Sequence, residues 1–365
     1  MKIVCTQENL KNGLSVAGRI VSNANTLPIL NNLLVKTESG MLKISSTNLE
    51  MAVVTRVRCR VESEGEVTVV GKTFSELINN MPNSNITLEN KGGELLVEAE
   101  NYHTKIKTLP VEEFPLIPTI EDGGILNLEA QELKNAVDSV SFATSTNQTQ
   151  PEISGVFLAK EGKSLRLAAT DRYRLAEKKL LTNDDSGSQE VIIPQKTVNE
   201  LSRIIGNQKG NVELVFSETQ LAVNFNDTQL ISRLVDGQYP AYREIIPTEF
   251  ITTITTQKQP LINALKAAAV FSQGSNSIKV DFNQKNQQMV ITSESADLGK
   301  SSVELPGKIF GSDVSLILNF HYLLEGLGSI EGENVLIKVI DDNSPSLIVP
   351  EGKTDFIYLV MPIKS

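Results

Sequence analysis

Three separate segments of the chain carry apolar residues at the spacing of an amphipathic helix. They cover residues 8–22, 131–145 and 258–273, with the sequences ENLKNGLSVAGRIVS, QELKNAVDSVSFATS and KQPLINALKAAAVFSQ. The apolar positions recur every three or four residues, as one face of a helix requires: Leu10, Leu14, Ala17 and Val21; Leu133, Val137 and Val140; Leu261, Leu265, Ala268 and Phe271. An asparagine follows the first leucine by two places in every copy, at Asn12, Asn135 and Asn263. The pattern predicts three related helices.

The segments that follow these helices are also alike. Two strand-like runs around a polar turn come next: LLVKTESGMLKISS, GVFLAKEGKSLRLAA and IKVDFNQKNQQMVITS. A second helix is predicted at residues 71–81, 194–205 and 319–330, and each repeat ends in a proline-marked segment: EFPLIP (113–118), YPAYREIIP (239–247) and VMPI (360–363). Each repeat of about 120 residues is a whole domain with two helices among many short strands, not a solenoid unit. Tandem domains of this kind suggest an arc, which closes into a ring if its ends are complementary.

Composition narrows the class of protein. The 365 residues hold 40% apolar and 21% charged side chains, as in ordinary globular proteins. No run of 18 apolar residues occurs and the N-terminus does not resemble a signal peptide, so we expect a cytoplasmic, nucleoid-associated protein that does not bind membranes. Cys5 and Cys59 have neither metal nor redox spacing, and His103 and His321 are far apart, so we expect no metal and no cofactor. The formal net charge of −10 argues against binding nucleic acid through bulk electrostatics.

Four motifs, in order within the repeats, give the chain a family resemblance. They are TLPILNNLL (26–34), ATDRYRLA (169–176), YPAYREIIP (239–247) and the terminal VMPI. With these motifs the whole chain resembles the bacterial β sliding clamps, the processivity subunit of the replicative DNA polymerase. The resemblance implies an α+β fold of three tandem clamp domains, at 1–122, 123–250 and 251–365. It also implies helices lining the inside of a ring and antiparallel sheets on its outside.

The same resemblance implies a function without catalysis. Two subunits would join head to tail as a homodimer that encircles double-stranded DNA, slides without reading sequence and takes part in DNA replication. The expected protein partners are the clamp loader, replicative and translesion DNA polymerases, and mismatch-repair and other proteins with a clamp-binding motif. The six predicted helices carry a net charge of +2, which leaves −12 for the rest of the chain. A mildly positive bore fits a ring that holds DNA topologically.

Carried over residue by residue, the resemblance implies a pocket between the second and third domains that docks partner peptides. Its residues are Ile153, Thr170, Arg172, Tyr173, Arg174, Leu175, Pro240, Ile245, Asn319, Tyr322, Val360, Met361 and Pro362. The sequence departs from the common family pattern at the rim. Arg172 and Tyr173 stand where Gly and His are common, Glu244 replaces a frequent basic residue, and Lys364–Ser365 replaces a frequent Arg–Leu ending. We expect alanine at both Leu175 and Met361 to abolish peptide binding and leave stability largely intact.

The resemblance also implies two further surfaces. Lys72 and Lys196, each at the start of a second helix, would face DNA, while solvated helix-end charge is the alternative explanation. Ala24 stands where some family members have an arginine, which predicts weaker contact between that loop and DNA. Val270 and Phe271 correspond to positions of the dimer interface, and core packing is the alternative for Phe271.

Two other classes of protein stay open. One is a β-rich repeat scaffold that binds only proteins. The other is a hydrolase that uses Asp171 as its catalytic acid, although no paired carboxylate or histidine lies near it in sequence. Without catalysis, Asp171 is expected to accept turn N–H groups or to pair with Arg172 or Arg174.

Overall fold

The computed structural model describes residues 1–21, 27–120, 123–147, 149–185, 187–272 and 274–364. Each sequence repeat contributes two α-helices to this part of the chain: α1 (Gln7–Ala17), α2 (Gly71–Asn80), α3 (Ala130–Ser141), α4 (Gln195–Ile205), α5 (Lys258–Ala269) and α6 (Phe320–Ser329). Four short 3₁₀ helices accompany them: η1 (Pro28–Asn31), η2 (Val111–Glu113), η3 (Pro151–Ile153) and η4 (Tyr242–Ile245). The predicted helices are confirmed, although the first helix of each repeat ends about four residues earlier than its apolar pattern suggested.

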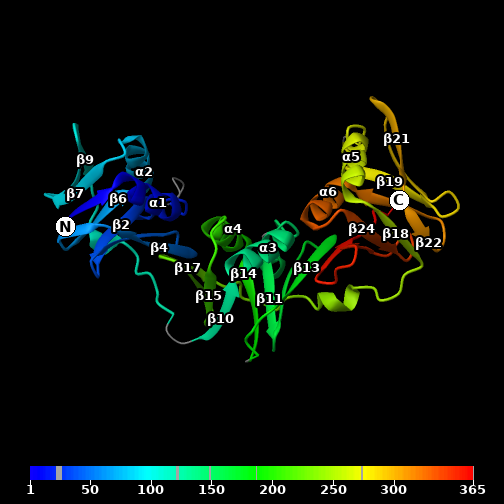
Figure 1. Cartoon of the computed structure of the whole chain (residues 1–365), viewed down its shortest axis with the longest axis horizontal. Coiled ribbons are helices and arrows are strands. Elements are labelled where there is room, and N and C mark those ends of the chain that lie inside the picture. The colour runs from blue at the N-terminus through cyan, green and yellow to red at the C-terminus, as the bar shows by residue number, and fades with distance from the viewer. Residues whose placement is uncertain (22–26, 121–122, 148, 186, 273, 365) are drawn as a thin grey trace. The chain divides into compact units, whose positions relative to one another are not determined.

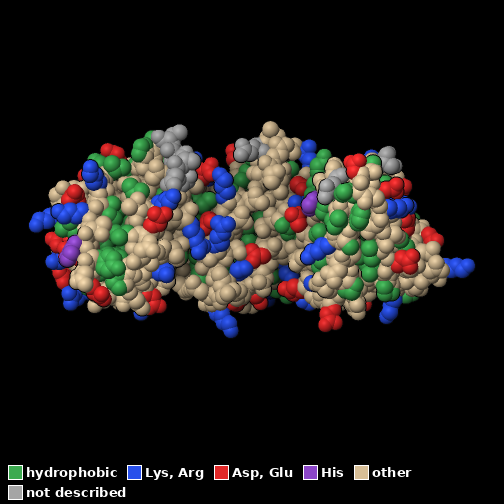
Figure 2. All heavy atoms as spheres, turned by 90° about the horizontal axis from the view of Figure 1, so that it is seen from above, with side chains coloured by type: hydrophobic (Ala, Val, Ile, Leu, Met, Phe, Trp, Pro, Cys, Tyr) green, Lys and Arg blue, Asp and Glu red, His purple; other side chains and the backbone are tan. Residues whose placement is uncertain are grey.

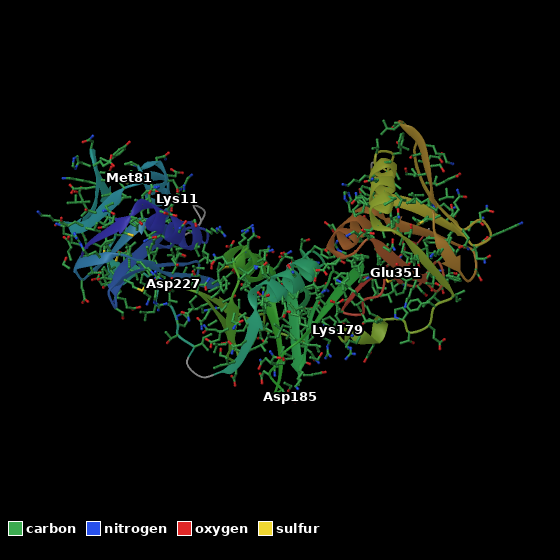
Figure 3. The ribbon with its side chains drawn as sticks, in the orientation of Figure 1. Lys11, Met81, Lys179, Asp185, Asp227 and Glu351 are labelled. Carbon is green, nitrogen blue, oxygen red and sulfur yellow. The ribbon has the colours of Figure 1, made fainter. Side chains whose placement is uncertain are left out.

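Local capping and one apolar stripe explain why α1 forms where it does. The Thr6 hydroxyl accepts a hydrogen bond from the N–H of Asn9 at the start, and the N–H of Gly18 bonds the Leu14 carbonyl at the end. Leu10 and Leu14 are buried, whereas Lys11 lies on the exposed face of the helix (Figure 3). The 3.6-residue period therefore separates a core face from a solvent face.

The chain forms two compact units, each built from two segments. One unit comprises residues 1–131 and 200–234, and the other comprises residues 132–199 and 235–365. The second repeat is therefore shared, with one half in each unit. Sheet pairing explains this division, because each half of that repeat continues a sheet of a neighbouring repeat.

The first unit contains two antiparallel sheets. A five-stranded sheet has the order β5-β1-β7-β8-β9, and an eight-stranded sheet has the order β10-β15-β16-β17-β4-β3-β2-β6. The strands are β1 (Lys2–Thr6), β2 (Asn32–Glu38), β3 (Met41–Thr47), β4 (Met51–Arg58), β5 (Arg60–Ser63), β6 (Glu66–Val70), β7 (Asn85–Lys91), β8 (Glu94–Ala99), β9 (Tyr102–Lys107), β10 (Gly124–Glu129), β15 (Asn211–Phe216), β16 (Gln220–Phe225) and β17 (Thr228–Arg233).

The second unit repeats this plan. A nine-stranded sheet has the order β14-β11-β12-β13-β26-β25-β24-β18-β22, and a four-stranded sheet has the order β21-β20-β19-β23. The strands are β11 (Gly155–Glu161), β12 (Ser164–Thr170), β13 (Arg174–Leu181), β14 (Ser188–Pro194), β18 (Thr252–Gln257), β19 (Ser277–Asn283), β20 (Gln288–Ser295), β21 (Gly299–Pro306), β22 (Lys308–Phe310), β23 (Val314–Asn319), β24 (Asn334–Val339), β25 (Ser346–Pro350) and β26 (Phe356–Val360).

One kind of strand pair joins neighbouring repeats in both units. The third strand after the first helix of a repeat pairs antiparallel with the last strand of the next repeat. This pair is β4 with β17 in the first unit and β13 with β26 in the second. We call each such pair a junction. The equivalent strands that remain, β9 and β21, are the outermost strands of their sheets.

Alternating burial along the strands places one face of each sheet against the core. In β8, for example, Leu95 and Val97 are fully buried between more exposed neighbours. The helices cover the sheets from the core side: α1 packs on β3 and β4, and α5 packs on β20 and β21 (Figure 1). The α+β class predicted from the sequence is confirmed. None of the helices in the described ranges combines the length and the apolar character that crossing a bilayer requires.

Candidate partner-docking site

The interrupted strand run around Asp171 is a tight hairpin turn between β12 and β13. The Asp171 carboxylate oxygen Oδ1 accepts the N–H groups of Tyr173, at 3.0 Å, and Arg174, at 3.1 Å. The Thr170 hydroxyl donates to the Arg174 carbonyl at 2.6 Å and accepts the N–H of Arg172 at 3.1 Å. Arg172 has a φ of +80°, a left-handed conformation that is unfavourable for a residue with a Cβ. The polar residues of this stretch therefore build the turn themselves.

Arg174 is fixed from four sides. Its Nε donates to Asp171 Oδ2 at 2.9 Å, its Nη2 donates to the Phe142 carbonyl at 2.9 Å, and its Nη1 bonds Glu325. The guanidinium also lies over the Tyr322 ring, 4.4 Å from its centre. Burial by itself lowers the pKa of Arg174, but the bond to Glu325 and the nearby negative charges outweigh this, so the pKa is raised. A permanently charged guanidinium thus stands at a fixed place beside an aromatic ring.

Strand β26 places the C-terminal residues beside this turn. Arg174 pairs with Val360 across the sheet, and the N–H of Met361 bonds the Tyr173 carbonyl at 2.8 Å. Behind them, Tyr358 is fully buried and its hydroxyl donates to the Tyr322 carbonyl at 2.9 Å. Main-chain hydrogen bonds therefore hold the turn to the end of β26, and the Tyr358 hydroxyl holds the start of α6 to the same strand.

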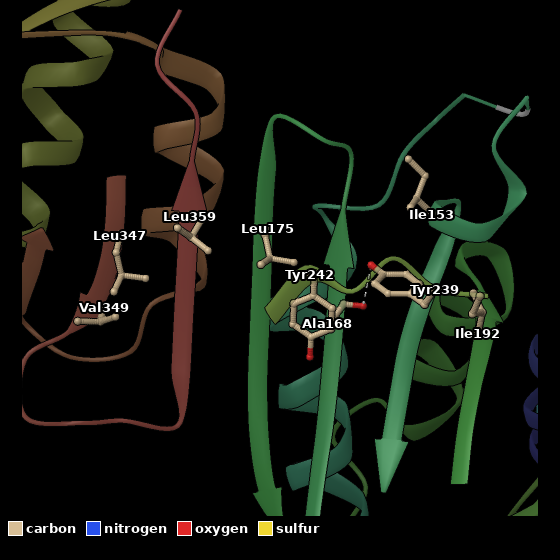
Figure 4. Packing of buried hydrophobic residues seen from close by; sticks show 9 residues of the cluster. All are labelled: Ile153, Ala168, Leu175, Ile192, Tyr239, Tyr242, Leu347, Val349 and Leu359. Atoms are coloured by element: carbon tan, nitrogen blue, oxygen red, sulfur yellow. Dashed lines mark hydrogen bonds between the residues drawn. The ribbon is translucent and has the colours of Figure 1, made fainter. Parts of the chain in front are cut away.

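A buried apolar cluster lies next to the turn and supports it. It contains Ile153, Ala168, Leu175, Ile192, Tyr239, Tyr242, Leu347, Val349 and Leu359 (Figure 4). The Tyr239 ring stacks on Phe157 with 4.6 Å between centres, and the Tyr242 hydroxyl donates to buried Glu177 at 2.6 Å. Burial, reinforced by the hydrogen bond to Glu177, raises the pKa of Tyr242. The segment 239–247 is thus anchored by its two tyrosines, and the residues between and after them lie at the surface.

The structure brings most of the predicted docking residues to one region, with unequal exposure. Arg172, Tyr173, Pro240 and Ile245 are exposed, Arg174, Tyr322, Asn319 and Met361 are half-buried, and Ile153, Thr170, Leu175, Val360 and Pro362 are buried. Asn319 caps α6, because its side chain accepts the N–H of His321 at 2.9 Å. Tyr173 and Ile245 expose 63% and 58% of their surface.

One expectation about these residues is wrong. Leu175 is 1% exposed and belongs to the apolar cluster, so truncating it to alanine removes core packing. Such substitutions cost about 2–5 kcal/mol, so the combined alanine variant of Leu175 and Met361 would lose stability as well as any binding. The expectation that Asp171 accepts turn N–H groups or pairs with Arg172 or Arg174 is confirmed: the carboxylate does both, and its ion pair is with Arg174.

Two residues that were not predicted from the sequence hold the site in place. Phe142, just after α3, supplies its carbonyl to Arg174 and its ring lies 5.6 Å from that of Tyr358. Glu325 lies one turn after Tyr322 on α6 and reaches the same guanidinium. The three-residue spacing of Tyr322 and Glu325 was the available signal, since such positions share one helix face.

Three family models match the chain in sequence. The N-terminal, central and C-terminal domains of the DNA polymerase III beta subunit match residues 1–118, 127–241 and 243–364. The chain belongs to the DNA polymerase III beta subunit family. It is 28% identical over 388 residues to the beta sliding clamp of Synechocystis sp., covering 100% of this chain and 99% of that one. Solved beta subunits from Pseudomonas aeruginosa and Thermotoga maritima match with TM-scores of 0.96 and 0.93, at 27% and 26% identity, over 100% of this chain and 100% and 99% of theirs.

The clamp residues expected to face DNA lie at helix starts. Lys72 and Lys196 are the second residues of α2 and α4, and both are exposed. The positive end of a helix dipole does not favour a cation there, so helix stability does not explain either lysine. On the face seen in Figure 2, Lys and Arg side chains are interspersed with Asp and Glu side chains. Ala24 lies outside the described residues.

The clamp residues expected at the dimer interface lie just past α5. Val270 is the C-cap of that helix and exposes 55% of its surface, while Phe271 is half-buried and its N–H bonds the Ala268 carbonyl. Both residues therefore follow the last residue of α5, whereas the sequence pattern predicted that they lie inside the helix. In the described part of the chain, no group of three or more His, Cys, Asp or Glu residues could hold a metal ion.

Proposed function

We propose that two copies of this chain close head to tail into a ring that encircles double-stranded DNA and confers processivity on a replicative DNA polymerase. Each copy would supply three clamp domains, at residues 1–122, 123–250 and 251–365. In this proposal the ring performs no chemistry, and its replication and repair partners dock on its surface. Asp171 supports this, because its carboxylate is engaged by two turn N–H groups and Arg174 and its side chain is only 13% exposed.

The single observation that carries the ring is the strand pairing at the junctions. Within the chain, the last strand of a repeat pairs with the third strand of the preceding one, as β17 does with β4 and β26 with β13. By the same rule, β9, the last strand of the first repeat, would pair with the third strand of another clamp domain. Strand β21 is the third strand of the last repeat and ends its sheet. An unpaired edge strand is a template for pairing with another chain.

Helix α5 packs against β21 and adds apolar surface beside this edge strand. Val270, at the end of α5, leaves an exposed apolar side chain on the element that packs against β21. Pairing β21 with β9 of a second copy would cover it. Since both copies carry both edges, two identical contacts close the ring and leave neither edge free.

A disulfide cross-link tests this pairing residue by residue. Leu230 on β17 lies opposite Val53 on β4, and the equivalent positions on β9 and β21 are Thr104 and Ser301. The variant Thr104→Cys with Ser301→Cys should form a covalent dimer on oxidation, since directly opposed strand residues lie within disulfide distance. Either single variant is the control.

The native thiols should not interfere with that test. Burial raises the pKa of Cys5 to about 12 and also raises the pKa of Cys59, so both react slowly. If the double variant gave no more covalent dimer than the single variants, the proposed pairing would be wrong.

The proposed hold on DNA is topological, and the lysines contribute only weak, sliding contacts. The protein should remain on a circular DNA after loading and leave when that circle is cut. Alanine at both Lys72 and Lys196 should reduce the salt-sensitive affinity for linear DNA and leave retention on the circle intact. Equal retention on linear and circular DNA would contradict the ring, and failure to associate with either would favour a scaffold that binds only proteins.

We further propose that the region around the 170–175 turn docks an extended peptide of the partners. These would be the clamp loader, replicative and translesion polymerases, mismatch-repair proteins and others with a clamp-binding motif. Tyr173, Ile245 and Met361 offer apolar surface, while Arg172 and Arg174 offer donors for peptide carbonyl or carboxylate groups. Val360, Leu175, Ile153 and Pro362 support these from below. Burying two bulky side chains contributes roughly 3–6 kcal/mol before ordering costs, so a single peptide should bind at about micromolar concentration.

The docking test replaces exposed Tyr173 and half-buried Met361 and leaves the buried cluster intact, so that loss of core packing does not confound it. Tyr173→Ser with Met361→Ala should weaken binding of a capped peptide holding one glutamine, one leucine and one phenylalanine by at least about tenfold, measured by calorimetry. Leu181→Ser is the matched control, because Leu181 is 84% exposed at the far end of β13, the strand that follows the turn. Unchanged affinity in the double variant, with a normal melting temperature, would contradict the docking role.

A further inference from the structure

The turn between β3 and β4, at the junction of the first unit, has the same hydrogen bonds as the 170–174 turn. The residues are Thr47, Asn48, Leu49, Glu50 and Met51. The Asn48 oxygen Oδ1 accepts the N–H groups of Glu50, at 3.0 Å, and Met51, at 2.8 Å, as Asp171 does for its own two residues. The Thr47 hydroxyl bonds the Met51 carbonyl and the Leu49 N–H, which repeats the two bonds of Thr170. Leu49 has a φ of +72°, matching the +80° of Arg172.

The strand that passes the turn is equivalent as well. The N–H of Arg233, at the end of β17, bonds the Glu50 carbonyl at 2.9 Å; the N–H of Met361 bonds the Tyr173 carbonyl at 2.8 Å in the other unit. Beside both turns runs a proline segment anchored by a buried ring, Phe114 before Pro115 and Tyr239 before Pro240. Leu30 in η1 packs against Phe114 and corresponds to Ile153 in η3. The backbone that positions the proposed docking residues is therefore present twice in the chain.

The second copy of this arrangement encloses a hollow. Its volume is about 350 Å³, within the range of small ligand sites. The apolar part of the wall comes from Leu49, Met51, Ala52, Pro115, Leu116, Pro118 and Ile231. Ala52 stands at the floor position that Leu175 fills in the other unit, and the smaller side chain leaves room.

Two apolar side chains at this hollow are unusually exposed. Leu116 exposes 99% of its surface and Leu49 exposes 49%, even though Leu49 also adopts a backbone conformation that branched side chains avoid. Large apolar side chains left in water around a hollow mark a surface that a partner covers. The rim differs in charge from that of the other junction: Leu49 and Met51 replace Arg172 and Arg174, and the charged residues of the lining are Glu50 and Arg233, one of each sign. The occupant therefore needs bulky apolar side chains and gains less from acidic groups beside them than it would at the other turn.

We propose that this hollow at the β4–β17 junction is a second docking site, for an extended peptide of a partner protein with two adjacent bulky apolar side chains and uncharged flanks. The proposal rests in part on the proposed docking role of the 170–175 turn, whose backbone it shares. Each chain then carries two sites of one architecture. The two arginines at the rim of one accept acidic flanks, and the rim of the other favours them less because Glu50 offsets the charge of Arg233.

Each site contains its own methionine, which allows the two to be observed separately. Met51 lines the hollow and Met361 lies beside Tyr173, among six methionines in the chain. The experiment records methyl NMR spectra of full-length protein labelled at the methionine methyl groups, assigned with Met51→Leu and Met361→Leu. It titrates the probe acetyl-Ser-Gln-Leu-Phe-Ser-amide and, separately, acetyl-Asp-Gln-Leu-Phe-Asp-amide. The neutral probe should shift both signals, and the acidic probe should shift Met361 at lower concentration than Met51.

The variant Leu49→Asn with Leu116→Ser provides the control. Asparagine tolerates the left-handed backbone at position 49 and Leu116 is fully exposed, so the fold should be kept. Affinity read from Met51 should fall at least about tenfold, while the Met361 response stays unchanged. A shift of Met361 without a shift of Met51, or a Met51 response that survives in the variant, would overturn the second site and leave the proposed function standing. A response of Met51 alone would support the second site and refute docking at the 170–175 turn, and no response at either would refute both.

Discussion

Asp171 offers a sharp test of whether the 170–174 segment is a structural turn. Its carboxylate makes two hydrogen bonds to main-chain N–H groups and one, at 2.9 Å, to the Arg174 side chain. Removing a typical hydrogen bond costs about 1 kcal/mol and removing one between two charged groups costs about 1.5–3 kcal/mol. Asp171→Ala should therefore lower stability by roughly 3–5 kcal/mol. The estimate needs little reduction for solvent screening, since the two side chains are 13% and 9% exposed.

Asparagine at the same position separates the two contributions. An asparagine oxygen can still accept both N–H groups, and the chain itself uses Asn48 in this way in the first unit. Asp171→Asn then loses only the charged bond to Arg174 and should cost about 1.5–3 kcal/mol. Near the melting temperature a unit of this size shifts by about 2–4 °C per kcal/mol. Calorimetry should therefore show a loss of roughly 5 °C for asparagine and roughly twice that for alanine.

Three results would refute this reasoning. Equal losses for both variants would show that the turn N–H bonds contribute nothing. A loss below about 1 °C for alanine would show that Asp171 does not stabilise the turn. Unchanged stability with abolished peptide binding in both variants would make Asp171 a ligand contact instead.

Three further predictions concern neighbouring positions. Arg172→Gly should leave the free energy of unfolding unchanged or raise it by up to about 1 kcal/mol, because glycine relieves the left-handed strain but adds unfolded-state entropy; a clear loss of stability in a denaturant titration would contradict this. Gly326→Ala should destabilise the second unit by about 1–3 kcal/mol, since an added Cβ would lie 2.2 Å from Cε1 of buried Tyr358, and a melting temperature equal to the parent would disprove the close contact. Burial alone raises the pKa of Asp355, but the hydrogen bond and charge of Lys178 outweigh burial and lower the pKa. The pair therefore contributes stability above about pH 4, and this contribution is lost as the pH falls further. In Asp355→Asn, the free energy of unfolding should fall less steeply with decreasing pH, and a slope equal to that of the parent would count against the pair.

The repeats and helices could be predicted from sequence because each depends on local spacing. Leu10 and Leu14, four residues apart, already define the buried face of α1. The ends of the helices were less predictable, since Val270 continues the apolar pattern of α5 although the helix ends at Ala269. Which strands pair between repeats is not encoded in spacing at all. The division of the second repeat between two units became visible only through the β4–β17 and β13–β26 pairs.

The family resemblance indicated the proposed docking region but not how deeply each of its residues is buried. Leu175, Val360 and Ile153 are apolar residues in strands or a short helix, and nothing in their identity separates a wall of a pocket from a core. Burial depends on what packs behind a residue, here Tyr239 and Tyr242 from a distant segment. Asn319 was likewise expected at the site, and its side chain is used in capping α6.

The repeated turn explains how the rim can change while the site's frame stays the same. In both units a threonine hydroxyl and an Asx oxygen make the bonds that shape the turn, whereas the residues at its tip contribute mainly their main-chain N–H groups. A glycine is the least strained residue at the left-handed tip, which accounts for its frequency in the family pattern at position 172. Arg172 and Leu49 show that larger side chains are also accommodated there, at a cost in backbone strain. Since the frame does not depend on the tip side chains, Arg172 and Tyr173 would be free to set which peptides bind at the proposed docking site.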